Sequence, residues 1–387
     1  MAYRRKTLAE HLDKAHAPKR ILALDGGGLR GILSIGFLQQ IEDTLRARHG
    51  GGAEFRLCHY FDLIAGTSTG AIIAAALAKG WSVEEIRVKY LELGQRVFEK
   101  SLFRNGLIRA KYDEAKLIPE LQAVYGSDTT LGGAELQTGL LVVMKRLDTG
   151  SPWPVSNNPA GKYYADRPNS VIGNSRYPLW QVVRASTAAP VYFKRETITI
   201  AQAAGKPPEQ GDFVDGGVSP FNNPALQALM YATMEGYRLG WPTGAERLLV
   251  VSVGTGMADP SVKRGALAAK EGIEALAALM DDSATLQETL LQWMSSSPTA
   301  RIINREIGDL AHDLIGGAPL ISYARYNVSL RKRELLELAP ELAAHEDIES
   351  LSAMDAPENM PLLEKLGKLG AARSVKGEHF PAAFDLG

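Results

Sequence analysis

A serine with a glycine two positions away on each side is the first group in this sequence whose setting could support covalent chemistry. The strand candidate DLIAG runs into GTSTG at residues 66–70, and the helical pattern AIIAAALAKG follows. A G-x-S-x-G turn between a strand and a helix is typical of a nucleophile elbow, which presents the serine hydroxyl at the positive end of the helix. The pattern therefore predicts that Ser68 is a nucleophile and that Gly66 and Gly70 allow the sharp turn.

An attacking serine needs hydrogen-bond donors for the oxyanion of the tetrahedral intermediate. Residues 25–31 read DGGGLRG, after a short aliphatic run that predicts a buried strand and before a helical pattern. Glycines in such a turn let several backbone N–H groups approach one oxygen, because no side chain blocks them. The candidate oxyanion donors are therefore the backbone N–H groups of Gly26, Gly27 and Gly28. Arg30 could orient the loop or stabilise the negative charge of the oxyanion.

The same glycine-rich loop allows a second interpretation. Gly26, Gly28 and Gly31 match G-x-G-x-x-G, the fingerprint of dinucleotide-binding folds. That function requires an acidic residue about 20 positions further on, at the tip of the next strand, to bind a ribose. Glu54 is the carboxylate in that region, and no strand leads up to it. A nucleotide-binding module is thus the less favoured alternative.

The base that activates the serine is the harder assignment. The chain has seven histidines, none in a recognisable motif, although His312 or His379 could complete a Ser…Asp…His order. A better candidate is Asp215, which ends a short apolar segment and is followed by Gly216 and Gly217. A carboxylate held against the serine hydroxyl could accept its proton directly.

Composition limits the remaining possibilities. The 387 residues are 45% hydrophobic with a net charge of −1, which favours a globular protein and gives no support to a nucleic-acid partner. A single cysteine excludes an internal disulfide and a multi-cysteine metal site, and we expect neither a metal nor a cofactor. The N-terminus lacks the apolar core of a signal peptide, and the longest apolar run, residues 71–78, is far shorter than the about 20 residues of a membrane span. We expect a cytoplasmic protein that can be peripheral at membranes.

Hydrophobic patterning predicts the fold class. Short aliphatic strands alternate with helical stretches as far as about residue 256, which is typical of an α/β fold with a mostly parallel sheet. We expect a polar lead-in over residues 1–20, a catalytic domain over 21–260 and a mainly helical region over 261–387 that packs on the catalytic domain or follows it. The strand candidates are residues 21–25, 62–66, 139–147 and 248–253.

Three motifs, DGGGLRG, GTSTG and DGG, occur in this order, with ASTAAP at residues 185–190 between the last two. In this combination the sequence resembles the patatin-like phospholipase family over roughly residues 20–256. The resemblance implies a three-layer α/β/α architecture with a mostly parallel central sheet. It also implies a Ser–Asp dyad of Ser68 and Asp215 that acts without histidine, with an oxyanion hole from the backbone of Gly26, Gly27 and Gly28.

The family resemblance further implies a substrate and a reaction. We expect a lipid acyl hydrolase of the phospholipase A type, which cleaves a fatty-acyl ester of a phospholipid through an acyl-serine intermediate and touches membrane surfaces transiently. An acyltransferase is the main alternative, because the same dyad can pass the acyl group to an alcohol or a thiol. The sequence makes no prediction about the oligomeric state.

Overall fold

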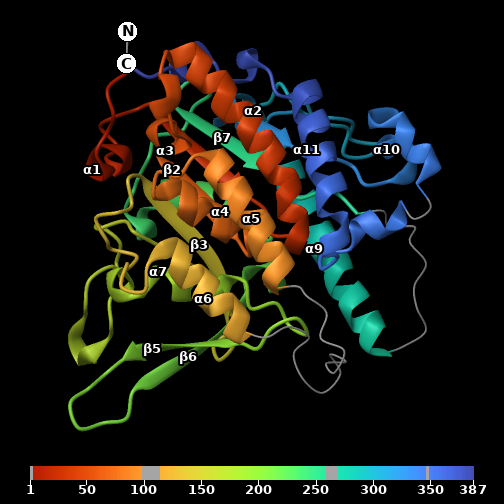
Figure 1. The fold of residues 1–387 in the computed structure, drawn as a ribbon. Coiled ribbons are helices and arrows are strands. Elements are labelled where there is room, and N and C mark those ends of the chain that lie inside the picture. The colour runs from red at the N-terminus through yellow and green to blue at the C-terminus, as the bar shows by residue number, and fades with distance from the viewer. Residues whose placement is uncertain (1–2, 98–113, 259–267, 346–347) are drawn as a thin grey trace.

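The fold is built on one mixed sheet with helices on both faces. The computed structural model describes residues 3–97, 114–258, 268–345 and 348–387 (Figure 1). The nine strands of the sheet follow the order β5-β6-β3-β2-β1-β7-β9-β8, and β4 pairs with β3 off this path. The strands are β1 (Lys19–Leu24), β2 (Leu63–Thr67), β3 (Gly139–Arg146), β4 (Ser151–Ser156), β5 (Glu196–Ala201), β6 (Glu209–Asp215), β7 (Leu248–Val253), β8 (Ser295–Ser296) and β9 (Ile321–Tyr326).

The central strands are parallel and carry apolar side chains on both faces. Strands β3, β2, β1, β7, β9 and β8 pair in parallel, whereas β4, β5 and β6 join through antiparallel pairings. Alternation along β1 sends Leu22 and Leu24 into one hydrophobic cluster and Ile21 and Ala23 into another. Parallel strands buried on both faces read as continuous apolar runs, which is why the sequence predicts them.

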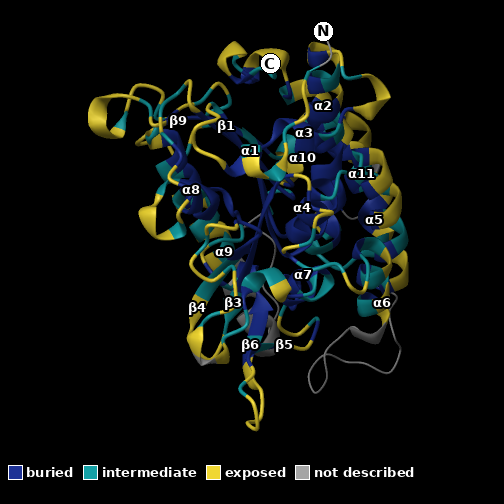
Figure 2. Ribbon diagram, turned by 90° about the vertical axis from the view of Figure 1, so that its left-hand side faces the viewer, coloured by how far each residue is buried: buried dark blue, intermediate teal, exposed yellow. Residues whose placement is uncertain are grey.

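Helices cover the two clusters. The helices are α1 (Leu8–Leu12), α2 (Gly31–His49), α3 (Leu57–Tyr60), α4 (Thr69–Ala78), α5 (Val83–Val97), α6 (Glu114–Tyr125), α7 (Leu179–Ser186), α8 (Ala225–Thr233), α9 (Ala268–Trp293), α10 (Lys332–Leu338) and α11 (Met360–Ser374). The larger cluster lies under α2, α4, α5, α7 and α11, and α8 covers the opposite face. Figure 2 shows the central strands and α4 buried and the outer turns of the surface helices exposed. The predicted α/β fold with a helix-bearing C-terminal region is confirmed.

The C-terminal region differs from the prediction of a mainly helical segment. The C-terminal region supplies β8 and β9 to the sheet, in addition to α9, α10 and α11. Residues 261–267 of that region lie outside the described part of the chain. A capping box of Ser82 and Glu85 opens α5, since the Ser82 Oγ accepts from the Glu85 N–H at 3.2 Å and the Glu85 carboxylate accepts from the Ser82 N–H at 2.7 Å. Among the described helices, none is long and apolar enough to cross a membrane.

A buried ion pair ties the end of β1 to β9 across β7. The Arg325 guanidinium donates to both carboxylate oxygens of Asp25, at 2.8 and 2.5 Å, and also to the Ser252 hydroxyl on β7 at 2.7 Å. Only 7% of each charged side chain is exposed. The first residue of the glycine-rich motif is thereby fixed by a residue 300 positions away.

We expect Arg325→Leu to destabilise the fold, because it leaves the Asp25 carboxylate buried without its counter-ion. Breaking one side of a buried pair typically costs about 3–5 kcal/mol. Urea denaturation should report that loss, and the double variant Asp25→Asn/Arg325→Leu should recover part of it. A single variant as stable as the wild type would show that the pair is dispensable.

Candidate active site

Ser68 occupies the strained turn that the G-x-S-x-G pattern predicts. The residue lies between β2 and α4 with φ 54° and ψ −125°, a conformation that costs a non-glycine residue about 1–3 kcal/mol. A side chain at Gly66 would strike the carbonyl oxygen of Gly70, and a side chain at Gly70 would strike that of Leu24 at the end of β1. Both glycines are therefore required by the close backbone approach that brings this turn beside the glycine-rich loop.

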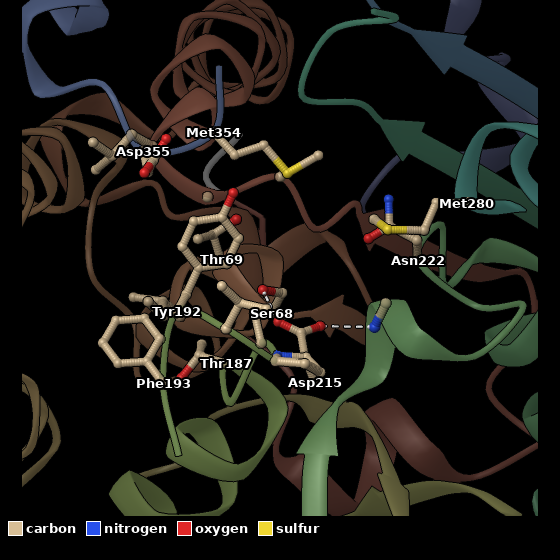
Figure 3. A pocket seen from close by; sticks show the side chains of 18 of the residues that line it. Ser68, Thr69, Thr187, Tyr192, Phe193, Asp215, Asn222, Met280, Met354 and Asp355 are labelled. Carbon is tan, nitrogen blue, oxygen red and sulfur yellow. Dashed lines mark hydrogen bonds between the residues drawn. The ribbon is translucent and has the colours of Figure 1, made fainter. Parts of the chain in front are cut away.

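Asp215 meets the Ser68 hydroxyl from the end of β6. The Ser68 Oγ donates to Asp215 Oδ2 at 2.5 Å, and the Gly217 N–H donates to Oδ1 at 2.7 Å (Figure 3). Gly216 has no room for a side chain, because a Cβ there would strike the Val143 carbonyl. Burial raises the pKa of Asp215 to about 6, since desolvation of the carboxylate outweighs the two hydrogen bonds that favour its charged form.

Ser186 fixes the turn that carries Ser68 through two hydrogen bonds. Its hydroxyl accepts from the Ser68 N–H at 2.9 Å and donates to the Val143 carbonyl at 2.6 Å. Ser186 ends α7, so this one side chain connects the nucleophile turn, α7 and β3. In the sequence, the ASTAAP motif indicated the segment that contains Ser186. The helical pattern alone does not reveal that the Ser186 hydroxyl reaches the nucleophile turn.

The glycine-rich loop lies beside Ser68, and its three glycines differ in their surroundings. The Gly26 N–H donates to the Asn222 carbonyl at 3.1 Å, whereas Gly27 and Gly28 line the cavity that contains Ser68. Arg30 is buried outside the lining, and its Nη1 donates to the Ser352 carbonyl at 3.4 Å. The guanidinium thus holds the loop against the C-terminal region.

The two candidate histidines lie apart from Ser68. His312 is exposed, and the His379 Nδ1 is 3.0 Å from the Tyr326 hydroxyl on β9. No histidine, lysine or arginine is among the described residues that line the cavity. Asp215 is therefore the titratable group in contact with the nucleophile.

The cavity around Ser68 has a volume of about 670 Å³ and is mainly apolar. Figure 3 shows Tyr192 and Phe193 on one side of the Ser68–Asp215 pair and Met280 and Asn222 on the other. Further apolar residues come from α4, α5 and α6, namely Ile72, Leu93 and Leu117. No group of acidic, histidine or cysteine side chains in the described part of the chain could hold a metal ion.

Ser68 follows the parallel strand β2 and Asp215 ends β6, which is antiparallel to β3, and the two form a buried pair that faces an apolar cavity, an arrangement compatible with a serine hydrolase. The model of one family, patatin-like phospholipase, matches residues 22–229, which is more than half of the chain. The chain belongs to this family.

Named relatives agree with the family. An intracellular phospholipase A2 from Caenorhabditis elegans is 31% identical over 70% of this chain and 23% of its own length. A cGAMP-activated phospholipase from Vibrio cholerae is 28% identical over 65% of this chain and 68% of its own length. A solved structure of human GIVD cytosolic phospholipase A2 aligns with a TM-score of 0.43 and 13% identity, over 97% of this chain and 62% of that one. The chain thus spans less than a quarter of the nematode relative and about two thirds of the bacterial one.

We expect Ser186→Ala to destabilise the protein by about 2–6 kcal/mol, since it leaves a buried N–H and a buried carbonyl unpaired at about 1–3 kcal/mol each. Urea denaturation measures the loss. Ser34→Ala, which removes one buried hydroxyl bonded to the Gly254 carbonyl at 2.8 Å, is the matched control and should cost less. Equal losses in the two variants would contradict the bridging role.

Proposed function

We propose that this protein is a lipid acyl hydrolase of the phospholipase A type, with Ser68 as nucleophile and Asp215 as general base. The observation that carries the proposal is the 2.5 Å hydrogen bond from the Ser68 hydroxyl to a buried carboxylate at the edge of an apolar cavity. Relatives named phospholipases support a phospholipid as substrate.

The proposed reaction has two halves. Asp215 takes the Ser68 proton as Oγ attacks the ester carbonyl carbon, and the carbonyl oxygen becomes an oxyanion bound by the N–H groups of Gly27 and Gly28. When the intermediate collapses, the alkoxy group leaves with the proton from Asp215, and the acyl group stays on Ser68. Water then attacks the acyl-serine, passes a proton to Asp215, and the fatty acid leaves as the Ser68 hydroxyl recovers that proton.

The Gly26 N–H has a different role in this proposal. Because it is bonded to the Asn222 carbonyl, we assign the oxyanion to Gly27 and Gly28 and assign Gly26 to the shape of the turn. Arg30 acts through the position of the loop, since its side chain does not line the cavity.

Lipid access requires a transient contact between the cavity mouth and a membrane surface. Val191, which lines the cavity, is 41% exposed, and Leu279, next to the lining residue Met280, is 63% exposed. Apolar side chains placed in this way can enter the interface of a bilayer and shorten the path of an acyl chain from the membrane into the cavity.

Ser68→Ala should abolish both acyl-ester cleavage and covalent labelling by a fluorophosphonate, because the nucleophile is removed. Asp215→Asn should lose nearly all turnover, because an amide cannot accept the proton. His312→Ala and His379→Ala serve as controls and should keep most activity. If either folded histidine variant were as inactive as Ser68→Ala, a Ser–Asp–His triad would replace the dyad.

Activity should fall as the pH drops through about 6, because Asp215 must be deprotonated to act and burial raises its pKa to about 6. If the base were an aspartate of unperturbed pKa, kcat/KM would stay unchanged as the pH falls to about 4. The measurement is kcat/KM against pH with a soluble acyl ester. A rate that is flat from pH 7 to pH 4.5 would exclude Asp215, with this raised pKa, as the base.

A further inference from the structure

The backbone of the glycine-rich loop is held by hydrogen bonds to three successive carbonyl groups. The Gly26 carbonyl accepts from the Thr255 hydroxyl at 2.7 Å and from the Asn222 side-chain amide at 3.4 Å. The Gly27 carbonyl accepts from the Arg30 N–H at 3.3 Å. The Gly28 carbonyl accepts from the Tyr90 hydroxyl at 2.7 Å and also from the backbone N–H of Gly31.

Fixing a carbonyl also fixes the N–H group of the next residue. In a trans peptide the C=O bond and the following N–H bond point in opposite directions within one plane. The bond from Thr255 therefore turns the Gly27 N–H away from Thr255, and the bond from the Arg30 N–H turns the Gly28 N–H away from Arg30. Gly27 and Gly28 line the cavity, and within the described part of the chain neither N–H has a hydrogen-bond partner.

The peptide group that joins Gly28 and Leu29 is held at both ends. Its carbonyl, from Gly28, receives the Tyr90 hydroxyl, and its N–H, from Leu29, donates to the Met354 carbonyl at 2.7 Å. Gly28 has φ +60°, a left-handed conformation that a glycine adopts without strain. With this peptide plane fixed on both sides and the preceding plane held through the Gly27 carbonyl, the torsion angles of Gly28 that connect the two planes are fixed as well, and with them the direction of the Gly28 N–H.

We infer that Tyr90 and Thr255 are positioning residues for the oxyanion hole, which aim the N–H groups of Gly27 and Gly28 by holding the carbonyls of Gly28 and Gly26. The inference rests on the proposed function and adds residues to it. Tyr90 and Thr255 are each only 3% exposed, so water cannot readily replace the lost hydroxyls as donors. Because the oxyanion exists only in the transition state and the intermediate, a misaligned donor lowers kcat and leaves substrate binding nearly unchanged.

The test uses substitutions that remove one hydroxyl and little else. Tyr90→Phe and Thr255→Val keep the size and burial of the side chain, and Thr255→Ser restores a hydroxyl at the same position. Such variants are sharper than alanine at the glycines, because a Cβ at Gly27 would itself strike Thr255 and a Cβ at Gly28 would strike the Met354 carbonyl.

Two matched controls remove equivalent bonds elsewhere. Tyr125→Phe deletes a buried hydroxyl that donates to the Ile72 carbonyl at 2.7 Å, and Thr138→Val deletes one that donates to the Phe61 carbonyl at 2.6 Å. Neither residue lines the cavity. They report the cost of losing such a bond for folding without disturbing the loop.

With a soluble acyl ester we expect kcat to fall roughly ten- to a hundred-fold in Tyr90→Phe and Thr255→Val, less than the hundred- to thousand-fold typical of removing an oxyanion donor. KM should stay within about twofold, because ground-state binding does not use the donors. The rate of fluorophosphonate labelling should fall in parallel with kcat. Thr255→Ser and both controls should keep kcat within about threefold of the wild type.

Different failures have different meanings. If the wild type is active and the folded Tyr90→Phe and Thr255→Val variants match its kcat, the positioning role is wrong and the proposed function stands. A rise in KM alone, or an equal loss of kcat in the controls, would likewise overturn the positioning role. A wild-type protein that neither cleaves the ester nor reacts with the fluorophosphonate would overturn the proposed function and this inference with it.

Discussion

The arrangement of the site depends on how closely the start of α4 approaches the end of β1. A side chain at Gly70 would clash with the Leu24 carbonyl, and a side chain at Gly66 would clash with the Gly70 carbonyl. This contact brings two strand-to-helix turns together, so that the serine of one lies beside the backbone N–H groups of the other. Ser68 itself has a positive φ in this turn, and its N–H is fixed by the 2.9 Å hydrogen bond to the Ser186 hydroxyl.

Burial of Asp215 serves the proposed chemistry and opposes stability at the same time. Removing the carboxylate from water disfavours its charged form, and this raises its pKa and makes it a better proton acceptor. Two hydrogen bonds, from Ser68 and from the Gly217 N–H, limit that cost. In the proposed reaction, the apolar cavity that receives the acyl chain is thus also the environment that raises the pKa of the base.

Local patterns in the sequence were sufficient for the parts of the fold that short segments determine. Continuous aliphatic runs predicted β1, β2, β3 and β7 to within about two residues, and glycine spacing located the turns that carry Ser68 and Asp215. Strand β4 was missed because Pro152 and Pro154 read as a turn, although an edge strand tolerates proline. Strand β9, Arg325 and Thr255 could not be predicted, because their contacts with the glycine-rich loop join residues more than 200 positions apart.

The Asp25–Arg325 pair shows that the glycine-rich motif of this chain is held from outside the segment that the family model matches. The segment that matches the family, residues 22–229, contains the serine, the carboxylate and the glycines, but Arg325, Thr255 and Met354 lie beyond it. In this chain the motifs and the residues that contact their backbone therefore lie in separate stretches of the sequence. A substitution at Arg325 or Thr255 can therefore alter the geometry of the glycine-rich loop while every residue of the motifs stays the same.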